Sequence, residues 1–130
     1  MKVLLDTSAL LWASYAPGKL TALAKEAFFI GESVTVSVVS FWEIGLKMSR
    51  GGYDGLDVPL DWEKSLPDWM EKQKFQLLGV DLAACRKIQD LPFHHKDPFD
   101  RMLIAQAMNG DFTVITSDDR FDDYGVKRIW

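Results

Sequence analysis

Short apolar runs alternate with helical segments along nearly the whole chain, and this alternation restricts the possible folds most strongly. The predicted strands are Lys2–Leu5, Val34–Ser37, Leu77–Val80, Phe112–Thr116 and Val126–Trp130. The predicted helices are Ser8–Tyr15, Leu20–Ile30, Val38–Arg50, Asp61–Lys74, Leu82–Asp90 and Pro98–Asn109. Strands that are separated by helices favour a parallel sheet with helices on both of its faces. The sequence therefore predicts a three-layer α/β/α domain with a mainly parallel central sheet.

The length and composition of the chain indicate one ordinary domain. Its 130 residues, 48% of them hydrophobic, are enough for one core. We therefore expect a single domain over residues 1–130. The single cysteine, Cys85, excludes a disulfide framework, so we expect a structural thiol and a reducing, cytoplasmic compartment. The apolar run after Met1 is too short for a signal peptide, and no run is long enough to span a membrane.

The net charge of −4 argues against a protein that coats nucleic acid generally, because such proteins are normally basic. This net charge does not exclude local basic patches. The candidate phosphate contacts are Lys47, Arg50, Arg86, Lys87, His94, His95, Lys96 and Arg101. Ordinary solvated surface charge is the alternative interpretation of each of these residues.

Four acidic residues lie near one predicted edge of the sheet, where the carboxyl ends of parallel strands meet the neighbouring helices. Asp6 and Asp118 follow predicted strands, while Glu43 and Asp100 lie in helices next to that same edge. Two carboxylates about 4 Å apart repel by about 1 kcal/mol in water and about 4 kcal/mol at an effective dielectric constant of about 20. Such a group needs protons or a cation, and a divalent metal ion supplies the charge. Without metal, neutralising one acid, for example by Asp118→Asn, should stabilise the fold.

Each acid also has a purely structural explanation. Asp6 and Asp118 can cap the helical turns that follow them. Glu43 and Lys47 have the spacing of an ordinary ion pair on a helix surface. Asp100 can add negative charge to a helix start that Asp97 caps.

The position of Asp100 on its helix favours more than a capping role. Leu103, Ile104 and Ala107 follow it at helical spacing, so Asp100 projects from an apolar face that should turn toward the sheet. A carboxylate there requires a partner. Capping provides part of one, and a metal ion at the sheet edge provides the rest.

Other catalytic chemistries find less support in the sequence. The chain has no glycine-rich phosphate loop, no cysteine and histidine spacing for a metal, and no nucleophilic serine elbow. Asp6 could instead be a phosphorylated nucleophile, as in haloacid-dehalogenase-like phosphatases or receiver domains. Ser8 stands where such a phosphatase has its second aspartate, and a receiver's acid pair is not evident.

Four segments of the sequence together resemble the PIN-domain ribonucleases, and in particular the VapC-like toxins of toxin–antitoxin pairs. These segments are Leu4–Trp12, Ser37–Ile44, His95–Ala107 and Thr116–Phe121. The resemblance implies a PIN-like fold, with Asp6, Glu43, Asp100 and Asp118 as the catalytic and metal-binding residues. It implies that Asp97 caps its helix while Asp100 reaches the site.

The same resemblance implies the activity and the partners. The expected enzyme is an endoribonuclease that uses Mg²⁺ or Mn²⁺ to hydrolyse RNA, with no other cofactor. The expected partners are RNA, a cognate antitoxin protein and a second copy of the chain in a homodimer. A catalytically silent PIN-like module that binds RNA or protein is the alternative. Some tryptophans should lie at interfaces, but we expect Trp12 and Trp42 in the core.

Overall fold

The computed structural model describes residues 1–130 and contains a five-stranded sheet in which every neighbouring pair of strands is parallel. The strands are β1 (Lys2–Leu5), β2 (Ser33–Ser37), β3 (Gln76–Leu78), β4 (Thr113–Ile115) and β5 (Arg128–Ile129). Their order across the sheet is β3-β2-β1-β4-β5, so β1 lies at the centre. The predicted mainly parallel sheet is confirmed, and it is parallel throughout.

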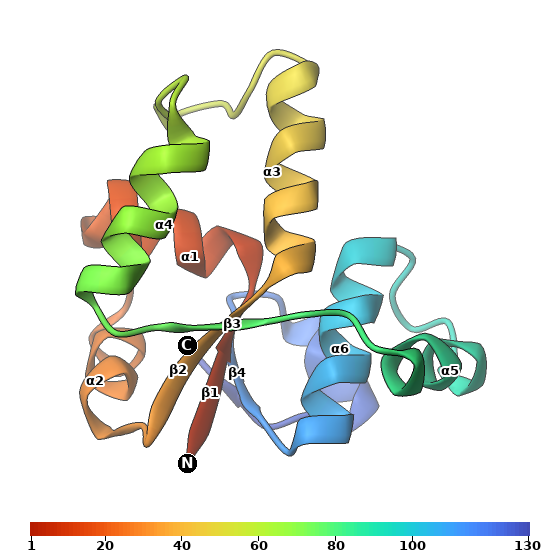
Figure 1. Ribbon diagram of the computed structural model, residues 1–130. Helices are drawn as coiled ribbons and strands as arrows, with labels where there is room; N and C mark the ends of the chain where they lie inside the picture. The colour runs from red at the N-terminus through yellow and green to blue at the C-terminus, as the bar shows by residue number, and fades with distance from the viewer.

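Helices cover both faces of the sheet, as Figure 1 shows. The α-helices are α1 (Thr7–Tyr15), α2 (Ala22–Ile30), α3 (Val38–Ser49), α4 (Trp62–Lys72), α5 (Leu82–Asp90) and α6 (Pro98–Gly110). Two short 3₁₀ helices, η1 (Pro17–Lys19) and η2 (Asp119–Tyr124), complete the chain. The predicted three-layer arrangement is therefore confirmed. No helix is both long and apolar enough to cross a membrane.

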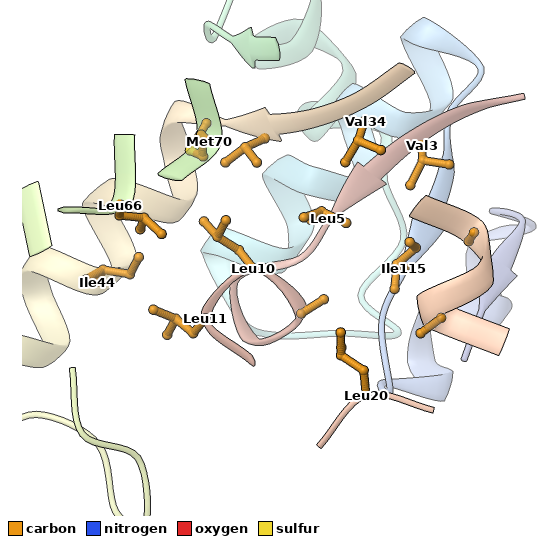
Figure 2. Close-up of a cluster of buried hydrophobic side chains, with 14 residues drawn as sticks. Val3, Leu5, Leu10, Leu11, Leu20, Val34, Ile44, Leu66, Met70 and Ile115 are labelled. Carbon is orange, nitrogen blue, oxygen red and sulfur yellow. The ribbon is translucent and has the colours of Figure 1, made fainter. Parts of the chain in front are cut away.

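The central strand β1 supplies both halves of the core. Val3, Leu4 and Leu5 are fully buried, because side chains alternate between the two covered faces of the sheet. Val3 and Leu5 pack in a cluster with α1, α2, α3 and α4, which Figure 2 shows. Leu4 packs on the opposite face with residues of α6 and η2. Burial on both faces fixes the position of β1, and with it the position of the residue that follows.

Two expectations about single side chains were wrong. Trp42 is 66% exposed, because Ser40 and Ile44 point into the core and Trp42 lies on the other side of α3. Its ring contacts Phe99 edge-on, with 4.9 Å between the ring centroids. Cys85 lies exposed on α5 and takes no part in either core cluster. Trp12 is partly buried against the first cluster, as expected.

Candidate metal and active site

The four predicted acids line one polar pocket of about 560 Å³ at the carboxyl edge of the sheet. Asp6 follows β1 and Asp118 lies just beyond β4, while Glu43 and Asp100 extend from α3 and α6. The lining residues are Asp6, Thr7, Ser8, Glu43, Asp100, Ser117, Asp118, Asp119 and Arg120, none of them hydrophobic. The fold thus brings together carboxylates that are up to 112 residues apart in the sequence.

Asp6 caps a helix and faces the pocket at the same time. Its Oδ1 accepts a hydrogen bond from the Ala9 backbone N–H at 2.7 Å, which is the predicted cap of α1. Its Oδ2 accepts a hydrogen bond from Thr116 Oγ1 at 2.6 Å, so β4 helps to orient it. Burial raises the pKa of Asp6 to about 6, although these two hydrogen bonds act in the opposite direction. The capping and pocket roles are therefore compatible.

Glu43 turns into the pocket and does not pair with Lys47. Its Oε1 accepts a hydrogen bond from Thr7 Oγ1 at 2.8 Å, which joins α3 to the start of α1. Burial raises the pKa of Glu43, and the hydrogen bond from Thr7 partly offsets this effect. The alternative of a surface ion pair with Lys47 is wrong, because the structure forms no such pair.

Asp100 is the carboxylate with the most strongly raised pKa. Asp97 caps α6 as expected, since its Oδ1 accepts hydrogen bonds from the backbone N–H groups of Phe99 and Asp100. That leaves the Asp100 side chain, 19% exposed, free to enter the pocket. Burial, followed by repulsion from Asp97, Asp6, Glu43 and Asp118, raises its pKa to about 8.

Asp118 has the opposite electrostatic environment. Its Oδ1 accepts a hydrogen bond from the Arg120 backbone N–H at 3.0 Å, so it caps η2. Burial by itself would raise the pKa of Asp118, but hydrogen bonds from Arg120 and His95 outweigh it and hold the pKa at about 2. One pocket therefore contains a carboxylate that keeps its proton at neutral pH and another that stays ionised.

His95, like Arg120, is a partner of the acids that sequence reasoning missed. Its side chain is 2% exposed, and its Nε2 lies 2.9 Å from Asp100 Oδ2 and 2.9 Å from Asp118 Oδ2. The sequence placed His95 only among possible phosphate contacts. Its signal was its position two residues before the cap Asp97, where a short loop can direct a ring back toward the helix start.

Arg101 was also predicted as a phosphate contact, and this prediction is wrong. Its side chain is buried, and its guanidinium donates hydrogen bonds inside the protein. The acceptors are the carbonyl oxygens of Ile88, Leu91, Pro92 and His95 and the Tyr124 hydroxyl. Arg101 therefore fixes the loop that carries His95.

The donor atoms of the pocket fit a hard divalent cation. One oxygen each of Asp100 and Asp118 and a ring nitrogen of His95 lie within 4.8 Å of one another, so the two carboxylates can reach one ion. Asp6 and Glu43 line the same pocket and have no lysine or arginine partner. Carboxylate oxygens suit Mg²⁺ or Mn²⁺ better than zinc. A metal ion here would replace the protons that the raised pKa values of Asp6 and Asp100 indicate.

Comparison with known proteins identifies the family of this chain. A family model described as the PIN domain matches residues 3–127. The chain belongs to the PIN domain family. This PIN domain is 24% identical to the ribonuclease VapC22 of Mycobacterium tuberculosis, over 98% of each chain. The resemblance that the four motifs indicated is thereby confirmed.

Solved structures share the fold of this PIN domain. VapBC2 from Rickettsia felis, bound to a DNA fragment from its promoter, superposes with a TM-score of 0.69 and 11% identity, over 98% of this chain and 97% of that one. FitAcB from Neisseria gonorrhoeae superposes with a TM-score of 0.65 and 18% sequence identity, over 97% of this chain and 95% of that one. VapBC-5 from Mycobacterium tuberculosis, a toxin–antitoxin system, superposes with a TM-score of 0.59 and 22% sequence identity, over 98% of this chain and 96% of that one.

Proposed function

We propose that this PIN domain is a metal-dependent endoribonuclease and the toxin of a toxin–antitoxin pair. The observation that carries the proposal is the convergence of Asp6, Glu43, Asp100 and Asp118 in one polar pocket. The relative VapC22, which is named a ribonuclease, matches nearly the whole chain and supports the same activity. Asp6, Asp100 and Asp118 are the proposed ligands of Mg²⁺ or Mn²⁺, with Glu43 as a further ligand or as the base that orients water.

The bound metal would polarise the phosphodiester and neutralise charge that develops on its oxygens. Glu43 suits the role of base because burial raises its pKa toward the range in which a carboxylate can accept a proton from water. Thr7 orients Glu43 through the hydrogen bond at 2.8 Å, and Thr116 orients Asp6 at 2.6 Å. The attacking water gives its proton to Glu43, its oxygen bonds to phosphorus, and the bond to the leaving oxygen breaks. The leaving oxygen keeps the electron pair of that bond and takes a proton from solvent water.

A second pocket continues from the acids along α3 and provides a path for the RNA backbone. It has a volume of about 360 Å³ and is lined by Glu43, Leu46, Lys47, Arg50, Gly52, Asp97 and Phe99. Glu43 also lines the acidic pocket, so the two pockets are adjacent. Lys47 and Arg50 form no ion pair and are available for phosphate groups. A single-stranded or looped RNA, whose backbone can bend into a pocket, fits this path best.

The proposed protein partners are an antitoxin and a second copy of the chain. Similarity of fold to complexes named VapBC supports the antitoxin. The surface also offers apolar side chains for a partner, since Leu23, Phe29 and Ile30 of α2 are all more than half exposed. The proposed compartment is the cytoplasm, where an exposed cysteine such as Cys85 stays reduced.

A catalytically silent binding module remains the alternative within the same family. Loss of an acid would favour it, but all four acids are present and face the pocket. Expression in a bacterial host separates the two functions. The wild type should arrest growth and leave cleaved RNA, Asp6→Asn should do neither, and the exposed-site control Asp68→Asn should behave as the wild type. Equal growth with wild type and Asp6→Asn would contradict the toxin.

A further inference from the structure

The backbone and the ring of His95 are both held by contacts within the protein. The backbone N–H of His95 donates to the Tyr124 hydroxyl at 2.9 Å, and that hydroxyl donates to the Pro92 carbonyl at 2.7 Å. Arg101 Nη1 donates to the His95 carbonyl at 3.4 Å. The ring itself lies edge-on to Phe121, with 6.3 Å between the centroids. A histidine on an ordinary surface loop has no such support.

The hydrogen bonds of the ring assign its tautomer. The backbone N–H of Asp97 donates to His95 Nδ1 at 3.1 Å. A backbone N–H can only donate, so Nδ1 carries a lone pair and the ring hydrogen is on Nε2. Nε2 therefore donates a hydrogen bond to Asp118 Oδ2 at 2.9 Å, and Asp100 Oδ2 lies equally close to the same nitrogen, at 2.9 Å. A nitrogen that carries a hydrogen has no lone pair in the ring plane for a metal ion.

Asp97 couples the tautomer to the position of Asp100. Its backbone N–H orients the His95 ring, while its carboxylate caps α6 and accepts from the Asp100 N–H at 3.2 Å. One residue thus sets both the direction of the Nε2–H group and the start of the helix that carries the carboxylate. The distance between ring and carboxylate is consequently fixed by the local backbone.

We propose that His95 is a positioning residue: its Nε2–H group, which donates to Asp118 and lies against Asp100, keeps these two carboxylates side by side for a divalent metal, and His95 does not bind the metal itself. The inference rests on the proposed metal-dependent function. A metal ion binds both carboxylates in their ionised forms, which repel each other, and a hydrogen-bond donor beside them offsets part of that repulsion. Loss of a residue that orients metal ligands typically weakens metal binding by about 10–100-fold.

Nitrogen NMR on the metal-free wild type tests the tautomer directly. The chain has two histidines, so a His94→Gln variant assigns the signals of His95. A protein labelled with ¹⁵N in its imidazole rings should show a hydrogen on Nε2 of His95 and none on Nδ1. The form with its hydrogen on Nδ1 would overturn the proposal, because Nε2 would then be a free metal ligand. This measurement requires neither metal nor RNA.

Metal binding by two variants tests the consequence. Calorimetric titration with Mn²⁺ should show about 10–100-fold weaker binding for His95→Leu, which has no donor. His95→Gln carries an amide N–H group in the region of Nε2 and should stay within severalfold of the wild type. Wild-type affinity in His95→Leu, or an equal loss in both variants, would overturn the donor role. If His95→Leu does not fold, the test rests on His95→Gln: binding of Mn²⁺ within severalfold of the wild type would support the donor role, and a larger loss would overturn it.

Pulsed electron paramagnetic resonance of bound Mn²⁺ separates positioning from direct ligation. The wild type should show no directly coordinated nitrogen, and a coordinated nitrogen would overturn the inference. RNA cleavage is measured in parallel on the same samples. A wild type that binds Mn²⁺ in a His95-dependent way but cleaves no RNA would contradict the proposed ribonuclease alone, while the role of His95 would stand.

Discussion

Arg120 holds Asp118 in a forked ion pair. Its Nε lies 2.9 Å from Asp118 Oδ1, and its Nη2 lies 2.8 Å from Asp118 Oδ2. The guanidinium is 55% exposed and lines the same pocket as the four acids. A cation of the chain itself therefore occupies a carboxylate that is a proposed metal ligand, and the two would compete for it.

Removal of this competing cation should strengthen metal binding. Arg120→Ala should bind Mn²⁺ up to about fivefold more tightly, since an exposed ion pair is typically worth about 0.2–1 kcal/mol. Calorimetric titration measures the change. The matched control is Arg86→Ala, which removes an exposed arginine paired with Asp90 on α5. Weaker binding in Arg120→Ala than in the control would mean that the guanidinium supports the metal site.

The metal-free protein should lose stability as the pH rises from about 4 to about 8. The pKa of Asp100 is raised from 3.8 to about 8, so the native state binds more protons than the unfolded state within this window. The free energy of unfolding therefore falls with increasing pH. Asp6, whose pKa is raised to about 6, acts in the same direction. Urea unfolding in chelator at several pH values should show this slope, and Asp100→Asn should reduce it. A slope of opposite sign would contradict the electrostatic account.

Neutralisation of Asp118 should destabilise the metal-free protein. The expectation from sequence was the reverse, but it treated all four acids as repelling one another. Arg120 and His95 hold the pKa of Asp118 at about 2, below its ordinary 3.8. Its contribution to stability is therefore present above pH 3.8 and is lost as the pH falls through about 2. Asp118→Asn should melt below the wild type in chelator at pH 7, and a higher melting temperature would restore the simple repulsion model.

Lys47 and Arg50 should act on RNA binding and leave the chemical step unchanged. The double variant Lys47→Ala, Arg50→Ala should raise KM with little change in kcat, and its RNA binding should depend less steeply on salt. The control is Lys64→Ala, an exposed lysine on α4 outside both pockets. An unchanged KM together with weaker binding of the antitoxin would assign this second pocket to the protein partner.

The sequence predicted the fold and the pocket because both depend on local signals. Asp6 follows a strand that is apolar on both faces, and Asp97 marks the start of α6 so clearly that the direction of Asp100 could be derived. The parallel arrangement then placed their carboxylates at one edge. These steps need only periodicity, capping and topology.

The sequence did not predict the nitrogen partners of the acids. The burial of His95 depends on Arg101 and Tyr124, which meet its loop only in the folded protein. For the same reason Arg101 looked like a surface cation although its guanidinium binds buried carbonyl groups. The pKa difference between Asp100 and Asp118 likewise follows from tertiary contacts that no local pattern encodes.

Cleavage of single-stranded RNA by the purified protein, freed of any antitoxin, tests the central claim most directly. The wild type should cleave with Mg²⁺ or Mn²⁺ and stop in excess chelator. Asp100→Asn should be inactive, and Glu43→Gln should be slower by about 10²–10⁴-fold if Glu43 is the base. Asp68→Asn, on the exposed face of α4, should keep full activity. Undiminished cleavage in chelator, or by Asp100→Asn, would contradict a metal-dependent site built from these carboxylates.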